Sequence, residues 1–180
     1  MLASTEILTF IHRWDVSAFH RLLRTHRCKP IVQSALWVSK SADGWLYPIV
    51  PAFFFCFGYQ HTQVLTSTLF LGLCLERIIY LIAKNSFRRR RPANILPDFR
   101  SLVIASDEFS FPSGHTSAAF LIVTALTLIV SPLFAFGYIW AIAVAASRII
   151  LGVHFPTDTL IGALLGTTAA GFSHNYVLQL

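Results

Sequence analysis

Charged residues are scarce in this chain. Asp, Glu, Lys and Arg make up only 12% of its 180 residues, whereas 55% of the residues are hydrophobic. Soluble domains carry about 25% charged residues, and a chain of this length forms one domain with one core. The composition therefore excludes an ordinary water-soluble enzyme and predicts a single domain embedded in a membrane.

Cysteine is also rare, and the three residues Cys28, Cys56 and Cys74 are far apart and odd in number. This spacing excludes a disulfide framework and the paired cysteines of a zinc knuckle. Because free cysteine behaves as a small hydrophobic residue, we predict that all three are buried.

Acidic residues number only eight. Asp98, Asp107 and Glu108 fall in one loop, but they lack the close spacing of metal ligands and share the loop with several cations. We therefore expect no metal ion and no other cofactor.

Long apolar segments make up most of the chain, and a crossing of the hydrocarbon core needs about 20 apolar residues. The four longest segments are residues 62–83, 113–130, 133–153 and 157–172. A fifth, residues 44–59, is shorter and contains Pro48 and Pro51. The sequence predicts an all-α integral membrane helical bundle with about five transmembrane helices. A sixth is added if the apolar piece at residues 31–39 forms a half-crossing helix.

The first 43 residues differ from the rest. Residues 4–28 interleave Phe, Ile, Trp and Leu with Arg and His, which favours an amphipathic helix at the level of the lipid headgroups. An ordinary surface helix has the same pattern. We therefore predict an interfacial N-terminal segment, residues 1–43, and a transmembrane part, residues 44–180, within one domain overall.

The polar connection from Lys84 to Pro112 is long for a loop in a compact domain, and loops of this length are usually functional or disordered. Helices that alternate in direction bring this loop, residue 113 and the junction near residue 154 to the same membrane face. The side chains expected to meet there are Lys84, Arg91, His115, Arg148, His154 and Asp158.

These residue types suit phosphate chemistry. Lys84, Arg91 and Arg148 can neutralise a phosphoryl group, and arginine does so with two parallel hydrogen bonds. Ser113 and Gly114 stand where a loop becomes a helix, so the serine hydroxyl and the free backbone amides can bind an anion. We therefore expect these five residues to bind phosphate.

Two histidines and one carboxylate can carry out the phosphoryl transfer. Pro156 favours a helix start, which places Asp158 close to His154. An aspartate that keeps one imidazole nitrogen protonated leaves the other nitrogen free to attack phosphorus. We predict that His154 is the nucleophile, that Asp158 orients it and that His115 acts as general acid and base.

Three motifs carry a resemblance to a known family. The sequence is similar to the type 2 phosphatidic acid phosphatase superfamily, whose signatures K-x6-R-P, P-S-G-H and S-R-x5-H-x3-D match residues 84–92, 112–115 and 147–158 without substitution. The resemblance extends over about residues 65–171. It implies a phosphohistidine intermediate formed without a metal, in a family that includes membrane lipid phosphatases, glucose-6-phosphatase and vanadium haloperoxidases.

Other ionisable residues are predicted to lie outside the site. The arginines at positions 88–90 fall in the variable part of the first motif, so we expect them to contact lipid phosphates or to set the membrane topology. Glu76 and Arg77 lie about 10–12 Å along a helix from Lys84. We therefore predict that these two join a structural polar network with neighbouring helices.

Taken together, the residues and the resemblance predict hydrolysis of a lipid phosphomonoester or diphosphate. Candidate substrates are polyprenyl phosphate or diphosphate, phosphatidylglycerol phosphate and phosphatidic acid. A membrane lipid phosphotransferase that uses the same residues and a non-catalytic lipid-binding scaffold are the alternatives. The expected partners are the phosphorylated lipid and the bilayer, with no nucleic acid and no obligate protein partner.

The resemblance favours an integral protein of a bacterial inner membrane, with its active site at one membrane face. Two arguments on the side of that face disagree. The positive-inside rule places the basic N-terminal segment and the basic loop in the cytoplasm, whereas the resemblance to lipid-recycling phosphatases favours the extracytoplasmic face. The sequence leaves both open.

Overall fold

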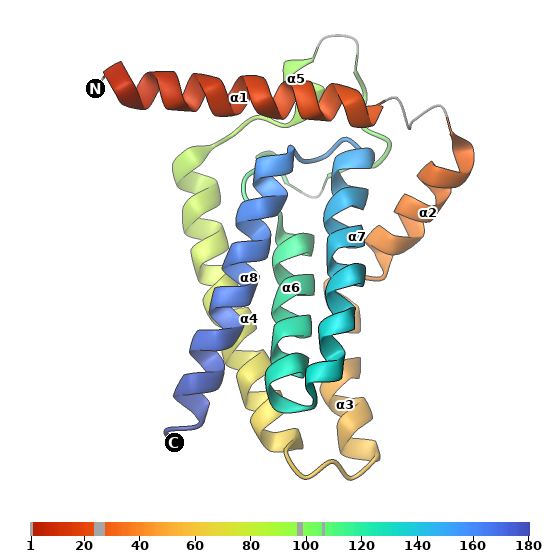
Figure 1. Ribbon diagram of the computed structural model, residues 1–180, viewed down its shortest axis with the longest axis vertical. Coiled ribbons are helices and arrows are strands. Elements are labelled where there is room, and N and C mark those ends of the chain that lie inside the picture. The colour runs from red at the N-terminus through yellow and green to blue at the C-terminus, as the bar shows by residue number, and fades with distance from the viewer. Residues whose placement is uncertain (1, 24–27, 97–98, 106) are drawn as a thin grey trace.

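The computed structural model describes residues 2–23, 28–96, 99–105 and 107–180 (Figure 1). Asp98, one of the acidic loop residues, lies outside these ranges. All regular structure in the described ranges is helical, apart from one isolated bridge between Arg90 and Phe109. The predicted all-α class is therefore confirmed.

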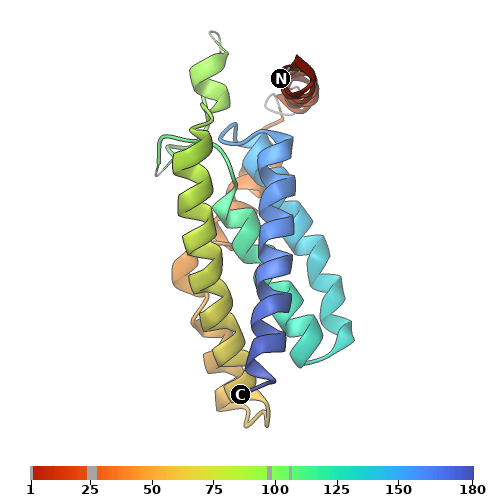
Figure 2. The ribbon, with the colours of Figure 1, turned by 90° about the vertical axis from the view of Figure 1, so that its left-hand side faces the viewer.

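Four helices form the bundle: α4 (Thr62–Phe87), α6 (Gly114–Ile129), α7 (Gly137–Ile150) and α8 (Pro156–Val177). They run alternately up and down, and the 3₁₀ helix η3 (Pro132–Phe136) joins α6 to α7 (Figures 1 and 2). Helix α6 packs against α4, α7 and α8. The four longest apolar segments are thus all helical, with ends within a few residues of those expected.

Two glycines let α8 approach α6 closely. A Cβ atom added at Gly166 would lie 1.9 Å from the carbonyl oxygen of Ser117, and one added at Gly162 would lie 2.6 Å from that of Ser113. Both distances are shorter than any real contact. The sequence Gly162-x-x-x-Gly166 therefore forms the kind of small-residue interface on which apolar helices pack backbone to backbone.

The predicted span at residues 44–59 is wrong as a single helix. The structure has the short 3₁₀ helix η2 (Gly44–Leu46) and then α3 (Ile49–Cys56), preceded by α2 (Lys29–Lys40). Pro48 lies between the two pieces. Its ring lacks an N–H donor, so it cannot continue the backbone hydrogen bonds of the first piece.

Within the described residues, two helical stretches are long and apolar enough to cross a membrane, Thr62–Phe87 and Pro132–Ile150. The prediction that the three cysteines are buried is wrong, because all are exposed. Cys74, for example, lies beside the exposed Phe70 and Ile78 on the outer face of α4. Cys74 thus belongs to an apolar face of α4 that points away from the bundle.

Helix α1 (Leu2–Leu23) lies across one end of the bundle, above α7 and α8, and the short α5 (Pro92–Ile95) lies at the same end (Figures 1 and 2). Phe19 is fully buried and packs edge-on against Phe99, with ring centroids 5.1 Å apart. Phe10 and Trp14 are exposed. The helix predicted at residues 4–28 is confirmed up to Leu23, and its place at the headgroup level stays a prediction.

Candidate active site

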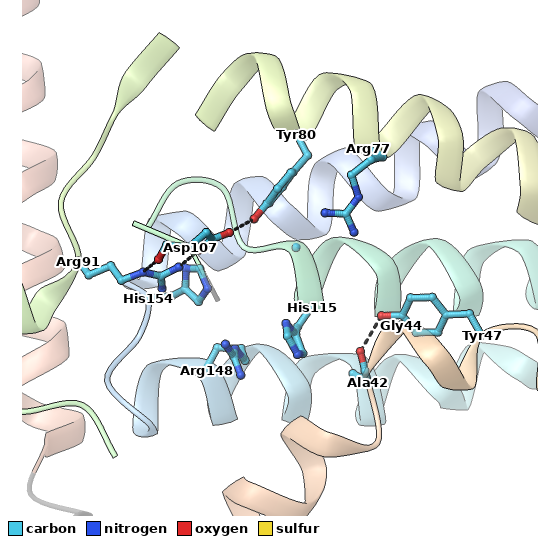
Figure 3. A pocket seen from close by; sticks show the side chains of 11 residues that line it. Ala42, Gly44, Tyr47, Arg77, Tyr80, Arg91, Asp107, His115, Arg148 and His154 are labelled. Atoms are coloured by element: carbon cyan, nitrogen blue, oxygen red, sulfur yellow. Dashed lines mark hydrogen bonds and ion pairs between the residues drawn. The ribbon is translucent and has the colours of Figure 1, made fainter. Parts of the chain in front are cut away.

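A cavity of about 160 Å³ opens at the end of the bundle that α1 covers (Figure 3). Helix α4 ends there, α6 begins there, and α7 gives way there to α8. The structure therefore brings together residues that are far apart in sequence. The ionisable side chains that line the cavity are Arg77, Arg91, Asp107, His115, Arg148, His154, Tyr47 and Tyr80.

His154 occupies the turn between α7 and α8 and is almost fully buried. Its Nδ1 atom lies 2.6 Å from the carbonyl oxygen of Ser110. A carbonyl oxygen can only accept, so Nδ1 carries the proton and Nε2 keeps a free lone pair. Burial, together with the nearby charges of Arg148 and Arg91, lowers the pKa of His154 to about 4, against the opposing effect of Asp158. The imidazole is therefore neutral near pH 7, as a nucleophile must be.

Asp158 does not make the hydrogen bond that the sequence predicts. Its Oδ2 atom is 3.8 Å from Nδ1 of His154, beyond hydrogen-bond range, and accepts instead from the backbone N–H of Phe155 at 2.8 Å. As the third residue of α8, Asp158 satisfies an amide that the helix leaves free. The Ser110 carbonyl thus orients the imidazole, and Asp158 supplies negative charge nearby.

Arg89 joins Asp158 to helix α1, so its assignment to lipid contact or topology alone is wrong. Nη1 of Arg89 donates to Asp158 at 2.7 Å, and Nη2 donates to Asp15 at 2.5 Å. Asp15 is fully buried and also accepts from the backbone N–H of Thr157 at 3.0 Å. We call Asp15, Arg89, Thr157 and Asp158 the rear network. The signal in the sequence was Asp15, which with Glu6 is one of only two carboxylates in the otherwise basic stretch at residues 2–23.

Lys84 and Arg91 both hold the carboxylate of Asp107, which also accepts from the Tyr80 hydroxyl at 2.6 Å. Burial alone would raise the pKa of Asp107, but the bonds from Lys84 and Tyr80 and the nearby cations outweigh it and hold that pKa at about 2. From sequence, Asp107 is a candidate only for metal binding, and its bridge between Lys84 and Arg91 is visible only in the structure. A bound phosphoryl group must share these two cations with Asp107 or displace it.

Of the other residues predicted to bind phosphate, Gly114 and Arg148 line the cavity and Ser113 does not. Ser113 is the N-cap of α6, as expected, but it is fully buried and its hydroxyl lies 3.0 Å from that of Thr116. Gly114 lines the cavity beside Tyr80. Arg148 also lines it and is steadied by a 2.6 Å bond from Nη1 to the Ser39 hydroxyl.

His115 and His154 both line the cavity (Figure 3). The Nε2 atom of His115 lies 3.1 Å from Oδ1 of Asp43, so this carboxylate fixes the orientation of the imidazole. Asp43 follows α2 and was not predicted, because nothing in the local sequence pairs it with residue 115.

Arg77 also lines the cavity, so the prediction that it serves only a structural network is wrong. The cavity extends along α4 past Tyr80, and the long arginine side chain reaches into it (Figure 3). Glu76 points elsewhere: it is buried, and its Oε1 atom has no hydrogen-bond partner in the described part of the chain.

Metal ligands do not converge here. In the described ranges, no group of three or more His, Cys, Asp or Glu side chains is arranged to hold a metal ion. The cavity instead gathers arginines around a neutral imidazole, an arrangement that binds and attacks an anion.

Two solved structures share this fold. The crystal structure of LpxE from Aquifex aeolicus superimposes with a TM-score of 0.77 and 28% identity, covering 89% of this chain and 94% of that one. The transmembrane PAP2 type phosphatidylglycerolphosphate phosphatase of Bacillus subtilis superimposes with a TM-score of 0.74 and 21% identity, covering 94% and 87%.

Sequence comparison agrees. An undecaprenyl-diphosphatase of Sulfolobus acidocaldarius is 29% identical over 74% of this chain and 66% of its own length. The chain spans 40–66% of the length of the curated relatives that it matches. The family description "PAP2 superfamily" matches residues 65–180, which is more than half of the chain. The chain therefore belongs to the PAP2 superfamily.

Proposed function

We propose that this chain is a membrane phosphatase that hydrolyses a lipid phosphomonoester or diphosphate through a phosphohistidine on His154. One observation carries the proposal: a buried, neutral histidine whose Nδ1 donates to Ser110 lines a cavity that also holds Arg91 and Arg148. The family membership and the printed activities of the relatives support the reaction class.

The reaction has two steps. Nε2 of His154 attacks phosphorus while Lys84, Arg91, Arg148 and the residues of the Ser113–Gly114 turn bind the phosphoryl oxygens, and His115 protonates the departing lipid oxygen. Water activated by His115 then cleaves the phosphorus–nitrogen bond and releases phosphate. The negative charge of Asp158 stabilises the imidazole as it becomes positive.

Five membrane crossings fit the arrangement of the helices. Helices α2 and α3, with η2 between them, run together from the α1 end to the opposite end, and α4, α6, α7 and α8 follow in alternating directions (Figure 1). Exposed apolar side chains such as Phe70, Ile139 and Leu164 lie on the outward faces. The site then lies at one membrane face, beneath the interfacial helix α1, in a bacterial inner membrane.

His154→Asn tests the mechanism. Asparagine can still donate to the Ser110 carbonyl but cannot form a phosphohistidine, so phosphate release should fall by about 10³-fold or more. Acid-quenched reactions of the wild type with a ³²P-labelled lipid should trap a phosphoenzyme that the variant lacks. His61→Asn, at the opposite end of α4, is the matched control. Full activity in the His154 variant would end the proposal.

Two native cysteines report the side of the site. Cys28 precedes α2 at the active-site end, and Cys56 ends α3 at the opposite end; both are exposed (Figure 1). A membrane-impermeant thiol reagent applied to intact cells should label only one of two variants that keep Cys28 or Cys56 alone. Labelling at Cys28 places the site outside the cytoplasm, and labelling at Cys56 places it inside.

A further inference from the structure

The cavity holds a cation beyond those that surround the reacting phosphorus. Arg77 lines it together with His115 and His154, yet it precedes Lys84 by two turns of α4, or about 10 Å at 1.5 Å per residue. Figure 3 shows its guanidinium pointing into the cavity from α4, on the side of Tyr80 away from Arg91. The cavity therefore has room and positive charge for more than one phosphoryl group.

Arg77 forms no salt bridge within the described part of the chain. Its guanidinium stacks on the ring of Tyr80, 4.9 Å from the centroid, and among the described residues no carboxylate lies within salt-bridge distance of it. Neighbouring helical residues face different directions, and Glu76 is buried against other helices. An arginine within an apolar helix is costly unless it is paired. Because Arg77 is exposed and lines the cavity, an anionic ligand bound there can supply the partner.

Arg77 also borders a groove on the outer face of α4. The groove is lined by Phe70, Leu73, Cys74 and Ile78. From His154 outward, the site thus presents the nucleophile, the acid His115, the cation Arg77 and an apolar surface. The same order is found along a lipid diphosphate: reacting phosphorus, bridging oxygen, second phosphate and hydrocarbon chain.

We propose that Arg77, stacked on Tyr80, binds the second phosphate of a lipid diphosphate, and that a diphosphate is the preferred substrate. The inference rests on the proposed hydrolysis at His154. Nε2 of His154 forms a bond to the distal phosphorus while the bond from phosphorus to the bridging oxygen breaks. The electron pair stays on that oxygen, which takes the proton of His115 and becomes a terminal oxygen of the departing lipid monophosphate. Arg77 pairs with the charge on the other oxygens of this second phosphate, whereas a monophosphate substrate offers Arg77 no anion.

The test compares two substrates with the same chain, farnesyl diphosphate and farnesyl monophosphate, using the full chain purified in detergent micelles. The wild type should have the higher kcat/KM for the diphosphate. Arg77→Gln should lower kcat/KM for the diphosphate by about 10- to 100-fold, the effect of one lost charge-assisted contact. The same variant should change kcat/KM for the monophosphate by less than about threefold. Inorganic diphosphate should likewise inhibit the variant less well than the wild type, with inhibition by orthophosphate unchanged.

Two further variants control for charge and folding. Arg88 is exposed, lies outside the cavity and bonds to the backbone of Asn85. Arg88→Gln therefore removes the same charge and should leave kcat/KM for both substrates unchanged. Arg77→Lys keeps the charge but not the planar fork, so it should recover part of the activity on the diphosphate.

The outcomes separate the two proposals. Hydrolysis of neither substrate by the wild type overturns the proposed function, and the subsite falls with it. If the wild type is active, equal losses on both substrates in Arg77→Gln mean that Arg77 serves the reacting phosphoryl group or the fold. No loss on either means that Arg77 does not touch the substrate. Either result overturns the subsite and leaves the proposed function standing.

Discussion

The ionic groups behind His154 and those in front of it are built differently. In the rear network, one cation lies between two fully buried carboxylates, and every carboxylate oxygen accepts from an N–H group. In front lie four cations, Lys84, Arg77, Arg91 and Arg148, and the single carboxylate that bridges two of them is Asp107. We call these five the front cluster.

The contrast separates support from binding. The rear network carries a net negative charge, which favours an imidazole that becomes positive when it is phosphorylated. The front cluster carries an excess of positive charge, which attracts an anion and stabilises its transition state. Variants in the rear network should therefore change stability and turnover, and variants in the front cluster should change ligand binding.

The largest expected effect comes from Asp15→Ala. It leaves Arg89 with Asp158 as its one remaining carboxylate partner and removes the acceptor for the backbone N–H of Thr157. Breaking a buried pair by removing one partner costs about 3–5 kcal/mol, and the partial exposure of Arg89 places this case near or below the lower end of that range. Thermal unfolding in detergent should show the loss. Asp15→Ala combined with Arg89→Met should be less unstable than the sum of the two single changes. Strict additivity would contradict a shared network.

Asp158→Asn should have a smaller effect on turnover than the loss of a tautomer-fixing aspartate, which costs about 10⁴-fold in a serine protease. Here the Ser110 carbonyl holds Nδ1–H, at 2.6 Å. The imidazole therefore loses only a nearby negative charge, and kcat should fall by about 10- to 100-fold. The new amide also turns a donor toward the N–H group of either Arg89 or Phe155, so the variant should be less stable as well. Steady-state phosphate release measures it. A loss of about 10⁴-fold would show that Asp158, not Ser110, orients the ring during turnover.

Asp107→Asn should have the smallest effect and the opposite sign. Removing the negative charge between Lys84 and Arg91 should strengthen inhibition by orthophosphate by about 3- to 10-fold. Because the pKa of Asp107 is about 2, its carboxylate is charged throughout the range of about pH 5–8, so any change with pH in the ratio between wild type and variant comes from the titration of orthophosphate and not of Asp107. Glu108→Gln, the neighbouring acid, is the control. Weaker inhibition in Asp107→Asn would mean that Asp107 positions the cations for phosphate.

Much of this site could be predicted from sequence. Helix lengths and their alternation place Lys84, His115 and His154 at the same end without any knowledge of packing, and the motif spacings identify the basic groups around them. The helical class follows in the same way, because apolar runs of this length leave no other structure that satisfies the backbone in a bilayer.

The features that were missed depend on contacts between distant segments. Asp15 meets Arg89 across 74 positions, and Asp43 meets His115 across 72. No periodicity links such residues, because their pairing is decided by how α1 and α2 pack on the finished bundle. Arg77 differs from the expectation for a simpler reason. Its distance from Lys84 along α4 is not its distance from the ligand, because the cavity itself extends along that helix.

The glycine contacts between α8 and α6 have a consequence for motion. Gly162 abuts the carbonyl of Ser113, and the N–H of Ser113 donates to the carbonyl of Asp158 at 3.0 Å. The Ser113–Gly114 turn and the first turn of α8, which follows His154, are thus held against each other. A movement that admits a bulky headgroup is therefore expected at the other wall of the cavity, formed by α4, the end of α2 and the loop that carries Asp107.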